Sequence, residues 1–178
     1  MTTRFAAAVC SLIAVFAVAA TAQEVNKEQV EGIANLARLQ TTVACAGAIT
    51  PKVVPEIKKM GFVSIINLRQ ANEPGADVEG EAAAVKAAGL RYYHVPFNGN
   101  MPDPKVADEF LAAITAKGAE PAFIHCAGGN RAATMWLIKR LVVDRWDEDR
   151  AVKEATALGQ TSVALRQFAL DYAKTHKR

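Results

Sequence analysis

The chain has 178 residues, of which 51% are hydrophobic and 22% are charged. This length suits one domain with a substantial core and is short for two. The 21 basic and 18 acidic side chains nearly balance, so the charge gives no reason to expect nucleic acid or a membrane surface as a partner.

The N-terminus has the layout of a secretory signal peptide. Arg4 precedes an apolar run over residues 5–20, and an A-x-A sequence ends at Ala22. The run is shorter than the roughly 20 residues that a membrane-spanning helix needs. We therefore expect a signal peptide over residues 1–22 and a periplasmic or secreted domain over residues 23–178, without a membrane anchor after cleavage. An uncleaved N-terminal anchor is the alternative.

Apolar spacing and turn residues predict the elements of the remaining chain. Helical spacing predicts a first helix over residues 27–38, and the apolar segment TVACAGAI could then be a strand. Thr50 before Pro51 predicts the start of a second helix, which Gly61 ends. Strands then alternate with helices: FVSIINL, RYYHVPF and PAFIH are predicted strands, and VEGEAAAVKAAG, PKVADEFLAAITAKG and residues 130–143, 147–158 and 162–176 are predicted helices.

This alternation indicates βαβ units and a largely parallel sheet that is covered on both faces. We therefore predict a single α/β domain with a central, mostly parallel sheet of about four or five strands flanked by helices. Ligands of such folds bind beyond the carboxyl ends of the strands. The segment CAGGNR lies at such an end, between a predicted strand and a predicted helix.

CAGGNR combines the residue types of an anion site and a nucleophile. Cys126 at the mouth of a helix would face unpaired N–H groups, which favour the nucleophilic thiolate. Gly128 and Gly129 let successive amides turn inward, and Arg131 offers a planar fork of donors to a tetrahedral anion. Taken singly, these residues could be a buried cysteine, a turn and a solvated arginine. Their order between a strand and a helix favours a phosphate cradle with a nucleophile at its base.

The segment FIHCAGGNRAATMWLIKRLVVDRWDEDRAVKEATALG resembles the signature segment of the cysteine-dependent dual-specificity protein tyrosine phosphatases. The segments ITPKVVPEIKKMGFVSIINLR and GLRYYHVPFNGNMPDPKVADEF resemble the parts of that family before its active-site strand. The resemblance covers roughly residues 43–160 and is closest to the bacterial beta-lactamase hydrolase-like branch. It implies a protein tyrosine phosphatase-like fold that hydrolyses phosphate monoesters of proteins or small molecules, such as phosphotyrosine or other aryl phosphates, without a cofactor.

The resemblance also implies the roles of the loop residues. Cys126 would accept the phosphoryl group, and a phosphocysteine intermediate would then be hydrolysed. His125 would support the thiolate indirectly. The phosphate would be bound by the side chain of Arg131 and by the backbone of Ala127, Gly128, Gly129 and Asn130.

The spacing within the loop leaves two other functions open. Four residues separate Cys126 from Arg131, whereas most of these phosphatases have five. Four is also the spacing of rhodanese-like sulfurtransferases, so the first alternative is sulfur transfer through a Cys126 persulfide. The second is a non-catalytic phosphate- or anion-binding pseudophosphatase that has kept the cradle and lost the general acid.

Two catalytic groups of the family are absent from their usual positions. Ala132 stands where the family usually has a hydroxyl that helps to break down the phosphoenzyme, and Thr134 lies three positions beyond Arg131, nearly a full helical turn away. The positions just after Phe97 hold no acid, so Asp103 is the nearest candidate for the general acid. A role of Asp103 as a turn residue or helix cap is at least as well supported.

The remaining candidates lie outside CAGGNR. Arg69 and Glu73 follow another predicted strand, where they could brace the site or belong to a solvated loop. Cys45, near the end of the first strand, could form a disulfide with Cys126 that protects the nucleophile, or could be a buried, inert thiol. No cluster of His, Cys, Asp or Glu has metal-ligand spacing, so we predict no zinc or iron site.

Overall fold

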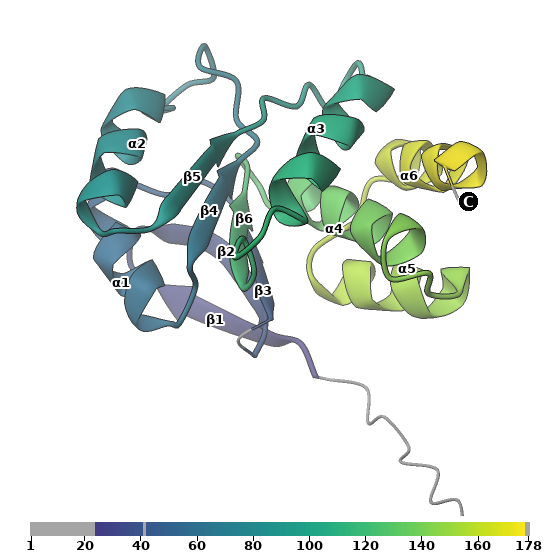
Figure 1. The fold of residues 1–178 in the computed structure, drawn as a ribbon, viewed down its shortest axis with the longest axis horizontal. Helices are drawn as coiled ribbons and strands as arrows, with labels where there is room; N and C mark the ends of the chain where they lie inside the picture. The colour runs from purple at the N-terminus through teal and green to yellow at the C-terminus, as the bar shows by residue number, and fades with distance from the viewer. Residues whose placement is uncertain (1–23, 41, 177–178) are drawn as a thin grey trace, which may run out of the picture.

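The computed structural model describes residues 24–40 and 42–176, so the predicted signal peptide lies outside the described residues. A six-stranded sheet runs through the domain in the order β1-β2-β3-β6-β4-β5, with helices on both faces (Figure 1). None of the described helices is both long and apolar enough to cross a membrane. The predicted α/β class is confirmed.

The parallel part of the sheet holds the predicted strands of the core. It consists of β3 (Val43–Ala46), β6 (Ala122–His125), β4 (Ser64–Asn67) and β5 (Arg91–His94). Every residue of β3, β4 and β6 is buried, as continuous apolar runs predict for parallel strands covered on both faces. The carboxyl ends of these strands therefore meet at one edge, where β6 leads into the CAGGNR segment.

The predicted helix over residues 27–38 is wrong. These residues form β1 (Asn26–Val30) and β2 (Ile33–Leu39), an antiparallel hairpin that pairs with β3 through β2. Asn35 has a left-handed backbone with φ 49°, which breaks the alternation of β2 and leaves Leu36 and Ala37 both buried. Buried positions three and four apart thus imitate a helix, and the hairpin raises the sheet to six strands.

The helices form two groups on opposite faces of the sheet (Figure 1). Apolar residues alternate between these faces, so that Ile65 and Phe123 belong to one core cluster and Ile66 and Ile124 to the other. The short helix η1 (Pro51–Val53), α1 (Val54–Lys59) and α2 (Val78–Ala87) cover the first face, and α3 (Pro104–Ile114), α4 (Asn130–Val142), α5 (Glu148–Ala157) and α6 (Val163–His176) lie on the second.

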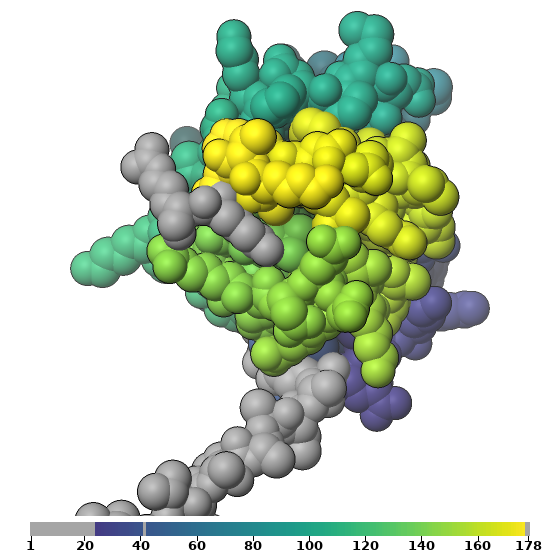
Figure 2. Space-filling model, turned by 90° about the vertical axis from the view of Figure 1, so that its right-hand side faces the viewer, coloured from purple at the N-terminus to yellow at the C-terminus, as the bar shows by residue number. Residues whose placement is uncertain are grey.

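Helix α4 is the central helix of the second face. Its Trp136 is among the largest fully buried side chains, and α3, α5 and α6 all pack against it. Figure 2 shows α6, in yellow, lying across the green segments of α4 and α5. Because α4 is fixed on several sides, the loop that opens it has a rigid support.

Candidate active site

The loop between β6 and α4 is held against the end of β3. The Cys126 N–H donates to the Ala46 carbonyl at 3.2 Å, and the Ala48 N–H donates to the Ala127 carbonyl at 2.9 Å. The Gly129 N–H donates to Cys126 Sγ at 3.1 Å. The sulfur, whose residue is only 1% exposed, therefore lies at the base of the loop and faces a backbone donor, as an anion cradle requires.

The two glycines of the loop have different roles. Gly129 has φ 96° and is the N-cap of α4, a backbone conformation that residues with a Cβ rarely adopt. Gly128 has no such φ, and nothing lies within 4 Å of where its Cβ would be. Only Gly129 is therefore needed for the turn that the sequence assigned to both.

Arg131 is a braced residue and not a solvated one. Its Nη1 and Nη2 donate to the two carboxylate oxygens of Glu73 at 2.6 and 2.7 Å. Nη1 also donates to the carbonyls of Phe97 at 2.7 Å and Leu68 at 3.2 Å. Arg131 lies close enough to Cys126 to interact with its sulfur. The two residues that the sequence singled out as nucleophile and anion clamp thus lie together.

Glu73 and Arg131 each shift the pKa of the other. Hydrogen bonds from Arg131 lower the pKa of Glu73 from 4.5 to about 2, although partial burial acts in the opposite direction. Burial works against the charge on Arg131, but the hydrogen bonds with Glu73 and the nearby Cys126 outweigh it and raise the Arg131 pKa. Both groups are therefore charged at neutral pH.

Arg69 fixes the loop that carries Glu73. Its guanidinium donates to the carbonyls of Pro74 at 2.6 Å and Gly75 at 2.9 Å. Its Nε lies 3.5 Å from Glu73, an ion pair without hydrogen-bond geometry, and only 4% of Arg69 is exposed. Of the two interpretations left open by the sequence, the structure supports the brace.

His125 lies behind the nucleophile. Its Nε2 is 2.8 Å from Glu81 Oε1, and both residues are buried. Its Nδ1 has no hydrogen-bond partner among the described residues. Alternation along β6 turns the His125 side chain away from Cys126, toward the face that α2 covers. Its indirect support of the thiolate stays a prediction.

A cavity of about 400 Å³ opens beside Arg131. Among the described residues that line it, Glu73 alone carries a carboxyl group, and that group is ionised at neutral pH. Its lining comprises Gln70, Glu73, Asn98, Gly99, Asn100, Arg131, Ser162 and Leu165. Asp103, the candidate general acid, is not among them; it is exposed and caps α3 by accepting from the Lys105 N–H at 2.9 Å. The structure thus gives Asp103 the role of a helix cap, and no protonated acid lies among the described residues that line this cavity.

A larger cavity of about 1130 Å³ lies on the other side of the loop, between the β1–β2 hairpin and the connection from α5 to α6. The side chain of Asn130 separates the two cavities. It donates to Thr161 Oγ1 at 2.9 Å and accepts from the N–H groups of Thr161 and Ser162. The sequence placed Asn130 in the cradle through its backbone and gave no signal for this side-chain bridge, since its partners lie about 30 residues away.

The structure also shows the surroundings of Ala132 and Thr134, the positions considered for the missing hydroxyl. Ala132 is buried, and the Thr134 hydroxyl donates to the Asn130 carbonyl at 2.8 Å. Thr134 is therefore engaged within its own helix and does not supply the missing hydroxyl. In the part of the chain that the structure describes, no group of three or more His, Cys, Asp or Glu could hold a metal ion.

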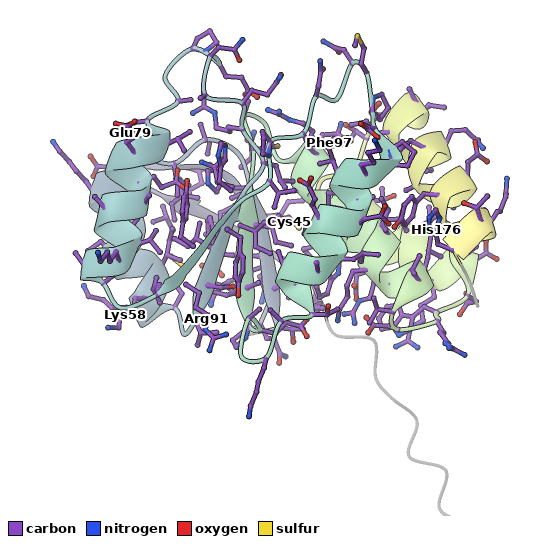
Figure 3. The ribbon with its side chains drawn as sticks, turned by 45° about the horizontal axis from the view of Figure 1, so that its top comes forward. Cys45, Lys58, Glu79, Arg91, Phe97 and His176 are labelled. Atoms are coloured by element: carbon purple, nitrogen blue, oxygen red, sulfur yellow. The ribbon has the colours of Figure 1, made fainter. Side chains whose placement is uncertain are left out.

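Cys45 is a buried free thiol, as is Cys126. It lies in the interior of the sheet (Figure 3) and pairs in register with Ile124, which comes two residues before Cys126 and shares a core cluster with it. Burial raises the pKa of Cys45 well above its ordinary value, and the nearby Cys126 adds to this effect. A disulfide between the two is not formed in this structure and stays a prediction.

The relatives of the chain share its loop region or its fold. A family model described as "Beta-lactamase hydrolase-like protein, phosphatase-like domain" matches residues 35–143. The Beta-lactamase hydrolase-like protein of Agrobacterium fabrum (strain C58 / ATCC 33970) is 33% identical over 108 residues, which are 57% of this chain and 24% of that protein. The chain thus spans about a quarter of the length of this curated relative.

Solved structures of low sequence identity show the same fold. A DUF442 protein of Shewanella putrefaciens CN-32 has a TM-score of 0.68 at 16% identity, over 83% of this chain and 97% of that one. TpbA of P. aeruginosa, in complex with pTyr, has a TM-score of 0.57 at 18% identity, over 85% of this chain and 88% of that one. Because the family model matches more than half of the chain, including β6, the cysteine loop and α4, the chain belongs to the family of beta-lactamase hydrolase-like phosphatase domains.

Proposed function

We propose that the chain is a cysteine-dependent phosphatase that hydrolyses phosphate monoesters through a phosphocysteine intermediate. One observation carries the proposal: Cys126 Sγ accepts the Gly129 N–H at the start of α4, with the braced Arg131 beside it. Nucleophile, backbone donor and cationic clamp therefore lie together, as binding and attack of a phosphoryl group require. Membership of a phosphatase-like family supports this assignment.

The reaction follows from the groups in place. The loop amides and Arg131 bind the phosphoryl oxygens, and the thiolate of Cys126 attacks phosphorus. The P–S bond forms as the bond to the leaving oxygen breaks, and the electron pair of that bond goes to the leaving oxygen. A water molecule then attacks phosphorus and the P–S bond breaks. Its electron pair returns to sulfur, and inorganic phosphate is released. Glu73 holds the guanidinium of Arg131 in place through both steps.

Aryl phosphates are the substrates that fit this site best. The described residues that line the cavity beside Arg131 supply no protonated acid to the leaving oxygen, so a leaving group that is stable as an anion is favoured. Met101 and Val163 are 75% and 77% exposed and directly follow the lining residues Asn100 and Ser162. They offer apolar contacts for an aromatic ring at the rim. TpbA, which shares the fold, has been crystallised with pTyr.

The experiment compares two activities of the reduced protein. We expect hydrolysis of p-nitrophenyl phosphate, lost in Cys126→Ser, and trapping of a phosphorylated Cys126 in rapidly quenched reactions. Thiocyanate production from thiosulfate and cyanide, without phosphate release, would instead support the sulfurtransferase alternative, which the four-residue spacing from Cys126 to Arg131 favours. Binding of phosphate without either turnover would identify a pseudophosphatase.

A further inference from the structure

We infer that Asn35, on the β1–β2 hairpin, is a positioning residue that orients the phosphate loop. Its Nδ2 donates to the Gly128 carbonyl at 3.2 Å, a contact between residues 93 positions apart in the chain. The inference rests on the proposed role of the loop in binding phosphate. It assigns a role at the active site to an element that lies outside the CAGGNR segment.

The geometry of the peptide bond carries the argument. A trans peptide is planar, so the carbonyl of Gly128 and the N–H of Gly129 point in opposite directions. Asn35 holds that carbonyl on the hairpin side of the loop, and the N–H at the other end of the same plane donates to Cys126 Sγ at 3.1 Å. The Asn35 contact therefore keeps this amide directed at the nucleophile.

Backbone hydrogen bonds hold the two neighbouring peptide planes. The Ala127 carbonyl accepts from the Ala48 N–H at 2.9 Å, and the Gly129 carbonyl accepts from the Ala133 N–H at 3.0 Å inside α4. Of these three successive planes, the middle one is the plane that a side chain holds. The Asn35 side chain is thus the part of this support that a substitution can remove without altering a backbone hydrogen bond.

The backbone of β2 is shaped to place Asn35 over the loop. Its φ of 49° lies in the left-handed region, which Asn tolerates better than most residues with a Cβ. Ala34, just before it, exchanges backbone hydrogen bonds with Gly47 and Ala48. A Cβ on Gly47 would meet the Ala127 carbonyl at 2.9 Å, so the loop and β2 approach closely here. A glycine at position 35 would serve the backbone at least as well, which leaves the amide donor as the reason for Asn.

Asn35→Gly tests the inference, because it removes the donor and keeps the positive φ. Gln40→Gly is the matched control: Gln40 is also exposed, has φ 46° and follows the far end of β2. We expect Asn35→Gly to melt no lower than the wild type and to bind orthovanadate about tenfold more weakly, as for one lost hydrogen bond to an anion site. Gln40→Gly should bind orthovanadate as the wild type does.

A second readout does not depend on turnover or on anion binding. The rate of Cys126 carbamidomethylation by iodoacetamide reports the thiolate, which the Gly129 N–H stabilises. At pH 7 this rate should be lower in Asn35→Gly than in the wild type and unchanged in Gln40→Gly.

Equal orthovanadate affinities and equal alkylation rates in Asn35→Gly, Gln40→Gly and the wild type would overturn the inference. If the wild type does not hydrolyse phosphate esters but Asn35→Gly still weakens orthovanadate binding, the proposed function fails and the positioning role stands. If the wild type does not bind orthovanadate, the alkylation rate alone decides.

Discussion

At the scale of single residues, the Glu73–Arg131 pair links the stability of the site to pH. The pKa of Glu73 is about 2 in the folded protein, against an ordinary value of 4.5. The folded state therefore binds a proton on Glu73 more weakly than the unfolded state does. The stability that this difference contributes is fully present above about pH 4.5 and is lost as the pH falls through about 2.

Glu73→Gln tests this dependence of stability on pH. The variant should unfold at lower urea concentration than the wild type at pH 7, because Arg131 and Arg69 lose the carboxylate that compensates their charge. The difference in unfolding free energy should stay constant from pH 7 to about 5 and shrink below that. The measurement is urea unfolding followed by circular dichroism at several pH values.

The matched control is Glu79→Gln, which changes an exposed glutamate on α2 (Figure 3). It should alter the unfolding free energy little at any pH, as is usual for solvent-exposed charges. A difference between wild type and Glu73→Gln that persists unchanged to pH 2.5 would contradict the role assigned to the Glu73 carboxylate.

The residues of the site differ in how far the sequence could reveal them. Cys126, Gly129 and Arg131 were predicted because their chemistry is local: a strand end, a left-handed turn and a helix start within six residues. Glu73 could only be offered as one of two possibilities, since its partner Arg131 lies 58 positions away. Asn35 gave no signal, because its contact with the loop depends on a hairpin that the apolar spacing concealed.

At the scale of elements, the turn that opens α4 depends on one glycine of the pair. Gly129→Ala should destabilise the protein by about 1–2 kcal/mol, the cost of a left-handed backbone for a residue with a Cβ. It should also reduce phosphatase activity, because the amide that faces Cys126 shifts when the turn relaxes. Gly128→Ala is the control, since its φ is not positive and its Cβ would meet open space. Thermal unfolding and p-nitrophenyl phosphate hydrolysis measure the two effects, and equal losses in both variants would refute the distinction.

The elements of the core followed from the sequence, whereas the hairpin did not. β4, β6, α2 and α3 could be predicted because their apolar runs, caps and turn residues agree with the final fold. Asp77, for example, caps α2 by accepting from the Gly80 N–H. In the hairpin, local spacing and tertiary structure disagree: the left-handed Asn35 produces a helix-like pattern inside a strand. This conflict coincides with the residue that supports the active site, and functional sites are where such conflicts are expected.

At the scale of the whole molecule, we propose that the domain acts outside the cytoplasm. The charge, apolar run and A-x-A sequence of residues 1–22 support export. Export matters for the active site because the mature domain contains two buried free thiols, Cys45 and Cys126. In an oxidising compartment, a nucleophilic cysteine needs protection. The 1% exposure of Cys126 limits its contact with oxidants.

Expression of the full chain in a Gram-negative host tests this proposal. Intact mass measurement of the periplasmic fraction should show a mature protein that begins at Gln23, because the A-x-A sequence ends at Ala22. Replacing Ala22 by a bulky residue should retain the longer precursor in the membrane fraction, since a signal peptidase accepts only small side chains at this position. Ser11→Ala, inside the apolar run, is the control and should leave processing unchanged. A cytoplasmic protein that starts at Met1 would refute export, and an uncleaved, membrane-bound form of the unaltered chain would favour the anchor.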